Sequence, residues 1–234
     1  MMQSIYKKYG PVSIILILTS LAAVLMLHQR GHFAEKTWQF LFFPWNLFLA
    51  WIPFVLSILL CSYSYSSLSG WKKGLWWTTF GLWLLFFPNA PYMLTDFIHL
   101  NQLDFVVWDG DHLIFNPDFS VWYDLVMFSL FIGTGIMLGC LSLHQIHVYL
   151  RRAKGNLASW LAVTIIMILS GYGIYLGRFV RLNSWDIFSP VQFVQQLSAT
   201  FTADTVLFVA LFSGYLFAAY IVCYGLIAMR NGQQ

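Results

Sequence analysis

Charged side chains are scarce in this 234-residue sequence. Lys, Arg, Asp and Glu make up 9% of it, against roughly 25% in a typical soluble domain. Apolar residues reach 59% and aromatic residues 19%, which argues against a water-soluble fold. The 12 basic residues are too few, and lie too close to apolar runs, to form a nucleic-acid-binding surface. We therefore expect an integral membrane protein with no nucleic-acid partner.

Cysteine is also scarce, and recognisable catalytic motifs are absent from the sequence. The three cysteines are odd in number and lie inside apolar runs, which excludes a disulfide framework and a cysteine metal cluster. No phosphate-binding loop, zinc-protease helix or nucleophile elbow is present. The residues identify no cofactor, and we predict no metal site. The cysteines are Cys61, Cys140 and Cys223.

Long apolar runs dominate the rest of the chain. A hydrocarbon core of about 30 Å takes about 20 helical residues to cross, and six runs approach or exceed that length. We predict an all-α, polytopic membrane protein that forms one domain over residues 1–234, with the first run retained as a helix. Two short interfacial helices complete it on the outer face. The predicted spans are 11–28, 38–62, 71–94, 120–143, 156–177 and 203–229.

The distribution of basic residues sets the expected orientation. With both termini in the cytoplasm, eight Lys and Arg residues lie inside and four lie outside, as the positive-inside rule requires. All nine carboxylates then fall on the outer side, although they were not used in the assignment. Glycine pairs with a spacing of four should let helices approach closely in the fourth and fifth spans. These glycines are Gly135, Gly139, Gly173 and Gly177.

The stretch 86–104, FFPNAPYMLTDFIHLNQLD, interrupts the third run with two prolines. A residue before proline is disfavoured in the helical region, so we expect the helix to end or kink at Phe87. Asn89 should then cap a following helix with Pro91 in its first turn. We expect that helix to lie along the outer surface. Its predicted polar face consists of Thr95, Asp96, His99 and Gln102, and its apolar face of Met93, Leu94, Phe97 and Ile98.

A second outer segment, GRFVRLNSWD at 177–186, follows the fifth span. Arginines on the disfavoured side of a bilayer are best explained if they pair with acids or bind an anion. We expect Arg178 and Arg181 to lie near Asp96, Asp124, Asp186 and also Asp204. The next motif, SPVQ at 189–192, resembles a capping box and predicts the second interfacial helix.

Each feature also has a plain structural explanation. Asp96 and His99 could form the polar face of an interfacial helix, and the arginines could belong to a structural ion-pair network. Asp109, Asp111 and His112 form a poor metal-loop pattern, because Asp-Gly and Asn-Pro-Asp are ordinary turn signals. His144 and His147 should lie at the cytoplasmic boundary and contact lipid head groups.

Three motifs carry a family resemblance: PNAPYMLTDFIHL at 88–100, WYD at 122–124 and GRFVRLNSWD at 177–186. On these residues the chain resembles a prokaryotic family of multispanning membrane proteins catalogued as domain of unknown function 1361, from the second span onward. The resemblance implies a multi-pass protein of a prokaryotic cell membrane. It implies no activity, substrate or cofactor.

The three motifs coincide with the three outer segments, which predicts one composite site. The leading hypothesis is a membrane component that binds an anionic lipid or a membrane-protein partner there. A second is an enzyme that acts on a lipid-linked envelope substrate, and a third is a small transporter with a broken third span. The predicted catalytic residues are Asp96, His99 and Asp124, and the predicted substrate-binding residues are Asn89, Tyr92, Arg178, Arg181, Asn183 and Asp186.

Overall fold

The computed structural model describes residues 2–182, 197–198 and 200–232. Within this part of the chain, five helical segments are long and apolar enough to cross a membrane, and the chain is a multi-pass membrane protein. The predicted all-α class is confirmed. The main helices of these five segments are α1 (Met2–Arg30), α2 (Phe42–Ser62), α5 (Phe119–Lys154), α6 (Asn156–Tyr175) and α8 (Ala203–Gly232).

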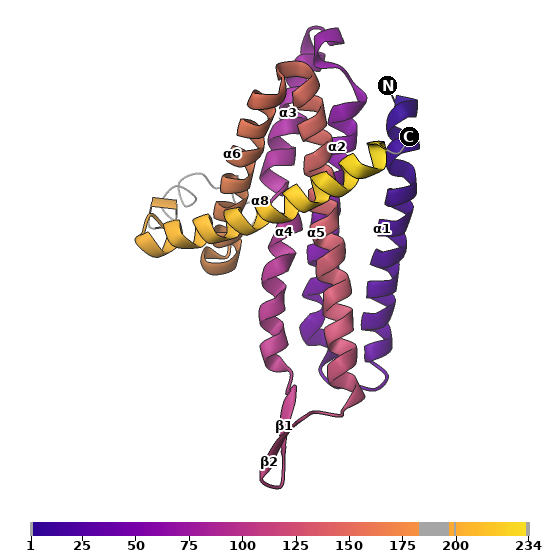
Figure 1. The fold of residues 1–234 in the computed structure, drawn as a ribbon, viewed down its shortest axis with the longest axis vertical. Coiled ribbons are helices and arrows are strands. Elements are labelled where there is room, and N and C mark those ends of the chain that lie inside the picture. Colours follow the sequence, from indigo (N-terminus) through magenta and orange to yellow (C-terminus); the bar gives the residue numbers. More distant parts are fainter. Residues whose placement is uncertain (1, 183–196, 199, 233–234) are drawn as a thin grey trace.

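The long helices form an elongated bundle (Figure 1). Helices α1, α2 and α5 run along its long axis, and α5 packs on both of the others. Helix α6 packs on α5 and on α8, and α8 crosses the bundle obliquely. The first turns of α1 and the last turns of α8 both lie toward the end of the bundle opposite the hairpin (Figure 1). Helix α5 has 36 residues and is about 54 Å long, so it extends well beyond a 30 Å hydrocarbon core.

The third predicted span differs most from expectation. Helix α3 (Trp71–Phe86) has only 16 residues, and α4 (Asn89–Tyr92) and a ten-residue 3₁₀-helix, η3 (Met93–Gln102), continue in the same direction (Figure 1). The α-helix does end at the predicted position. However, Phe87 stays helical at φ −55° and ψ −40°, and its amide donates to the carbonyl oxygen of Trp83. The predicted loss of helical backbone at Phe87 is therefore wrong.

The predicted faces of η3 are only partly found. Met93 and Asp96, which were predicted on opposite faces, are both buried, whereas Phe97 and Ile98 are exposed. Residues three apart share one side of a 3₁₀-helix, so Met93 and Asp96 lie on the same side. The helix packs on α5 and α4, and its exposed apolar residues suit lipid contact.

A β-hairpin follows η3 at the far end of the bundle (Figure 1). Strand β1 (Val106–Asp109) pairs antiparallel with β2 (His112–Phe115). Gly110 adopts φ +60° in the connecting turn, a conformation that glycine tolerates best. The Asp-Gly and Asn-Pro-Asp signals of this stretch predict turns but not strands. After the hairpin, the Asp118 carboxylate caps α5 by accepting a hydrogen bond from the Ser120 amide.

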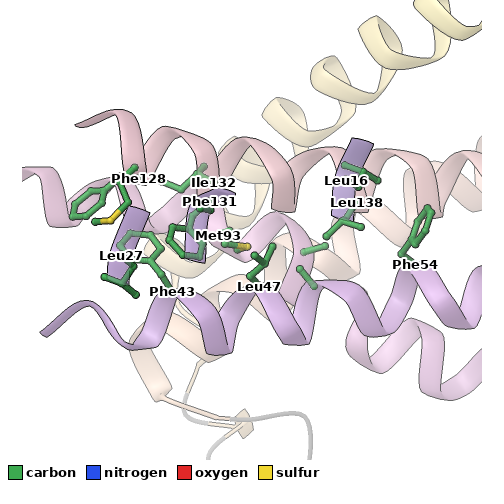
Figure 2. Packing of buried hydrophobic residues seen from close by; sticks show 14 of the residues in the cluster. Leu16, Leu27, Phe43, Leu47, Phe54, Met93, Phe128, Phe131, Ile132 and Leu138 are labelled. Carbon is green, nitrogen blue, oxygen red and sulfur yellow. The ribbon is translucent and has the colours of Figure 1, made fainter. Parts of the chain in front are cut away.

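The interior contains two apolar clusters. One joins α1, α2, η3 and α5, and Figure 2 shows Phe43, Phe128 and Phe131 packed beside Met93 within it. The Phe43 and Phe131 rings are stacked with 5.1 Å between their centroids. The second cluster surrounds Trp83 and Tyr220 and joins α2, α3, α5, α6 and α8.

The predicted glycine pairs meet a single short segment, residues 88–93. Pro88 lies against Gly173 and Ala90 lies against Gly139, while Tyr92 lies against Gly177 and Met93 against Gly135. A methyl group added at any of these four glycines would come within 3.2 Å of the facing side chain. The glycines thus allow α5 and α6 to approach α4 from two sides, and this fixes the start of η3.

Candidate functional site

The Asp96 carboxylate is held by two other elements of the fold. Its Oδ1 lies 2.6 Å from Nη2 of Arg178, and its Oδ2 accepts a hydrogen bond of 2.9 Å from Nδ2 of Asn46 on α2. Asp96 is 1% exposed. Burial raises the pKa of Asp96 above its ordinary value, and the hydrogen bonds from Asn46 and Arg178 oppose that rise. The carboxylate therefore joins η3 to α2 and to the end of α6.

Arg178 reaches Asp96 from η4 (Leu176–Val180), a π-helical turn that continues α6. The Arg178 guanidinium also donates to the Thr95 hydroxyl from Nε and Nη2. Its Cζ lies 4.7 Å from the centroid of the Tyr92 ring, within the range of a cation–π interaction. Wide π turns change the direction of the side chains that follow them. Here the turn places Arg178 against η3 with 20% of its side chain exposed.

His99 lies one 3₁₀ turn after Asp96 and is half-buried. Its ring centroid is 4.5 Å from that of Phe42. Burial lowers the pKa of His99 below the ordinary 6.5; the Asp96 charge opposes this shift and the Arg178 charge adds to it. The imidazole is therefore neutral at pH 7, and it can accept a proton. The predicted grouping of Asp96, His99, Tyr92 and Arg178 is found in the structure.

Asp124 belongs to a different ion pair, and its predicted proximity to Arg178 is not found. Its two oxygens accept hydrogen bonds of 2.7 Å and 2.9 Å from Nε and Nη2 of Arg30, at the end of α1. The remaining Arg30 nitrogen, Nη1, donates to the Glu35 carbonyl oxygen and to the Thr37 hydroxyl. Phe40 covers the guanidinium at 4.6 Å. Among the described residues, the acidic and basic groups thus form two separate pairs and not one composite site.

The other predicted site residues have different outcomes. The Asn89 side chain donates to the Phe86 carbonyl oxygen and does not cap the next helix, so that prediction is wrong. Arg181 is exposed at φ 62°, where it ends the π turn. Asp204 is exposed in the first turn of α8. Asn183, Asp186 and the predicted helix after Ser189 lie outside the described residues, apart from Leu197 and Ser198.

His144 and His147 do not contact lipid head groups as predicted. They are 3% and 1% exposed because α5 continues for ten residues beyond His144, and α8 and α6 cover this part of it. Nδ1 of His147 is 2.7 Å from the Tyr220 hydroxyl. The His147 ring also packs 4.5 Å from that of Trp160. These histidines are therefore part of the helix packing in the half of the bundle opposite the hairpin.

Two residues of the polar network were not predicted as site residues. Arg30 carries the same signal as Arg178, since it is a base at the end of an apolar run, on the side that the charge distribution predicts to be the outer one. Asn46 is an amide within an apolar helix, which is expensive to bury without a partner. Either signal could have marked its residue as a candidate for the polar network. Neither signal identifies which carboxylate the side chain contacts.

The geometry limits the chemistry at the hairpin end of the bundle. Arg30 and Arg178 are each neutralised by a carboxylate, so neither of these two arginines offers an uncompensated charge to a phosphate. His99 is the group best placed to exchange a proton. Among the residues that the structure describes, no three His, Cys, Asp or Glu side chains gather as metal ligands. Asp109 and His112 face each other across the hairpin turn.

Comparison with known proteins gives one match. No curated protein and no solved structure is significantly similar to this chain. One family model, described as a protein of unknown function (DUF1361), matches residues 45–219. The match includes Asn46, η3, Asp124 and η4, but it ends before the last turns of α8 and excludes α1. The chain belongs to the DUF1361 family of proteins of unknown function.

Proposed function

We propose that this protein is a non-catalytic membrane component that binds a second membrane protein at its outer face. The single observation that carries the proposal is the exposed apolar face of the β-hairpin. The two ion pairs support it, because they anchor the helices next to the hairpin.

Six crossings are part of the proposal. Helix α2 ends at one end of the bundle and α5 begins at the other, so the chain must return between them. Helices α3, α4 and η3 make that return in series. The bases Lys72, Arg151 and Arg152 lie at the end opposite the hairpin, which supports a cytoplasmic location for that end and for both termini.

The hairpin presents four large apolar side chains on one face. Val106 pairs with Phe115 and Trp108 pairs with Leu113, and residues two apart on a strand share a face. Val106 is 47% exposed, Phe115 75%, Trp108 69% and Leu113 60%. An isolated two-stranded hairpin is marginally stable in water, and exposed apolar patches mark interaction surfaces. A partner that covers this face would stabilise the hairpin.

Charge favours a basic protein partner over an anionic lipid. Four carboxylates flank the apolar face, and the outer side has nine carboxylates against four bases. An anionic membrane surface would be repelled by them, as would the same face of a second copy. A partner with Lys or Arg around an apolar patch would be complementary. The flanking carboxylates are Asp104, Asp109, Asp111 and Asp118.

A photo-crosslinking amino acid at position 108, in intact cells, tests this proposal. We expect one discrete adduct with a different protein, which mass spectrometry identifies. Asp109→Lys with Asp111→Lys should weaken the adduct, while the same crosslinker in place of Lys154, at the opposite end, should not form it. Adducts with lipid alone, or with a second copy of this chain alone, would contradict the proposal that a different protein covers the hairpin.

A membrane enzyme is the second candidate, because His99 is a half-buried, neutral imidazole beside Asp96 and Arg178. Such a group can serve as a general base. Purified protein would then release phosphate from a polyprenyl phosphate donor, and His99→Ala would abolish turnover without loss of folded protein. Trp108→Ser, far from His99, should leave that turnover unchanged. A transporter was suggested by a break in the third span: the α-helix is interrupted between Phe86 and Asn89, but Phe87 and Pro88 keep helical dihedrals, which gives this candidate little support.

A further inference from the structure

A groove lies between α2 and α3 at the end of the bundle opposite the hairpin. It has a volume of about 640 Å³, within the range of small-molecule sites. Leu59 and Leu75 form its apolar part, and Ser67, Ser69 and Lys72 lie at its polar end. One end is therefore suited to a hydrocarbon chain and the other to a charged head group.

The back of the groove is rigid. The Trp76 indole donates to the Leu60 carbonyl oxygen at 3.4 Å, and its ring stacks on Phe80 with an interplanar angle of 5°. The linker before α3 is tied to α5, because the Tyr65 amide donates to the Tyr149 hydroxyl at 2.9 Å. Gly70, at φ +51°, then turns the chain into α3. These contacts hold the wall of the groove in place.

The electrostatics at the polar end are unbalanced. Lys72 and Lys73 lie in the first turn of α3, where the helix dipole is positive and lysine is unfavourable. This first turn has no acidic residue, and no side chain caps it. The sequence contains no Asp or Glu between Glu35 and Asp96. An anion at this position would offset the repulsion between the two lysines and the positive end of the α3 dipole, and it would bind to a helix N-terminus.

We propose that this groove binds one phospholipid with a net negative head group. The head-group phosphate lies at the start of α3, beside the Lys72 ammonium and the Ser67 and Ser69 hydroxyls. One acyl chain lies over Leu59 and Leu75. Basic pockets between membrane helices on the cytoplasmic side have this recognition chemistry. The site is independent of the outer-face partner.

Native mass spectrometry of the purified full-length protein tests the proposal. Phosphatidylglycerol and phosphatidylcholine with identical acyl chains would be added in equal amounts. We expect one retained phosphatidylglycerol in preference to phosphatidylcholine. Lys72→Gln should weaken its retention about fivefold, the factor that corresponds to ~1 kcal/mol per lysine at an anionic surface. Lys154→Gln, at the same end but outside the groove, is the matched control and should have no such effect.

A second variant tests the acyl contact. Leu75→Trp fills the apolar part, and Leu75 is exposed, so the fold should tolerate the change. We expect loss of the retained lipid while the protein stays monodisperse in chromatography. Equal retention of the two lipids would overturn the proposal, as would equal losses in Lys72→Gln and Lys154→Gln. Displacement of the lipid by an equimolar amount of inorganic phosphate would also overturn it, because the acyl chain would then contribute nothing.

Discussion

Asp96 and Asp124 are both 1% exposed, and each has an arginine partner from a distant part of the chain. A carboxylate is costly to bury unless it is paired and hydrogen-bonded. Arg178 and Asn46 satisfy Asp96, and Arg30 satisfies both oxygens of Asp124. At the scale of residues, the hairpin end of the bundle is therefore held by charge pairing and not by apolar packing alone.

Removal of Arg30 should therefore be strongly destabilising. Arg30→Gln leaves Asp124 buried without its bidentate partner, and we expect a loss of about 3 to 5 kcal/mol in the free energy of unfolding. Denaturant titration in detergent would measure it. Arg181→Gln is the control, because Arg181 is exposed, and its effect should stay within about 0.5 kcal/mol. A similar small effect for both variants would mean that Asp124 is solvated.

His99 should make stability depend on pH. Its pKa in the folded state is below 6.5, so the unfolded chain binds a proton first as the pH falls. The free energy of unfolding should then decrease as the pH falls through 6.5, until the lower folded-state pKa is reached. The pKa of Asp96 is raised above 3.8, so the folded state binds this proton first as the pH falls further. Protonation of Asp96 should therefore increase the free energy of unfolding.

Thermal midpoints between pH 8 and pH 5.5 would test this prediction. We expect His99→Gln to flatten the decrease seen in the unmodified protein, since glutamine does not titrate. Parallel curves for the two proteins would show that His99 has the same pKa in the folded and unfolded states.

At the scale of elements, α4 is the point where α5 and α6 approach the segment between α2 and the hairpin most closely. Gly173→Ala would place a methyl group 2.8 Å from Cγ of Pro88, whose ring cannot rotate away. We expect a loss of about 1 to 3 kcal/mol from this overpacking, measured as the free energy of unfolding in detergent.

Gly133→Ala is the matched control for that variant. Gly133 lies in α5, but a methyl group there meets no atom within 4 Å. Alanine is the better helix former, so we expect unchanged or higher stability. Equal losses at Gly173 and Gly133 would mean that the close approach to Pro88 does not matter.

At the scale of the whole molecule, the proposed crossing of 71–94 can be tested by labelling. Single cysteines at Ser66, Asp111 and Lys154 all lie at exposed positions, while the three native cysteines are buried. With an impermeant thiol reagent on intact cells, we expect labelling at position 111 only. Labelling at both 66 and 111 would mean that this segment does not cross, and labelling at 66 and 154 alone would invert the orientation.

The sequence predicts some levels of this structure better than others. Membrane helices were predictable because length and hydropathy are local properties, and the Asp96–Arg178 pair followed from bases on the disfavoured side. The partner of Asp124 could not be predicted, because the choice between Arg30 and Arg178 depends on tertiary packing. The faces of η3 were only partly predicted, because an α-helical period places Met93 opposite Asp96, whereas the 3₁₀ period of three residues places them on one side. The hairpin was missed because its strands have only four residues.

The 3₁₀ geometry of η3 has a consequence for its evolution. Residues three apart in such a helix are eclipsed, so Met93, Asp96 and His99 stand in one column, with about 6 Å of rise between successive members. Insertion or deletion of one residue would rotate every later member by a third of a turn and turn it away from the column. Related chains should therefore vary the identities of Phe97 and Ile98 freely among apolar types, yet keep the number of residues between Pro88 and His99 constant.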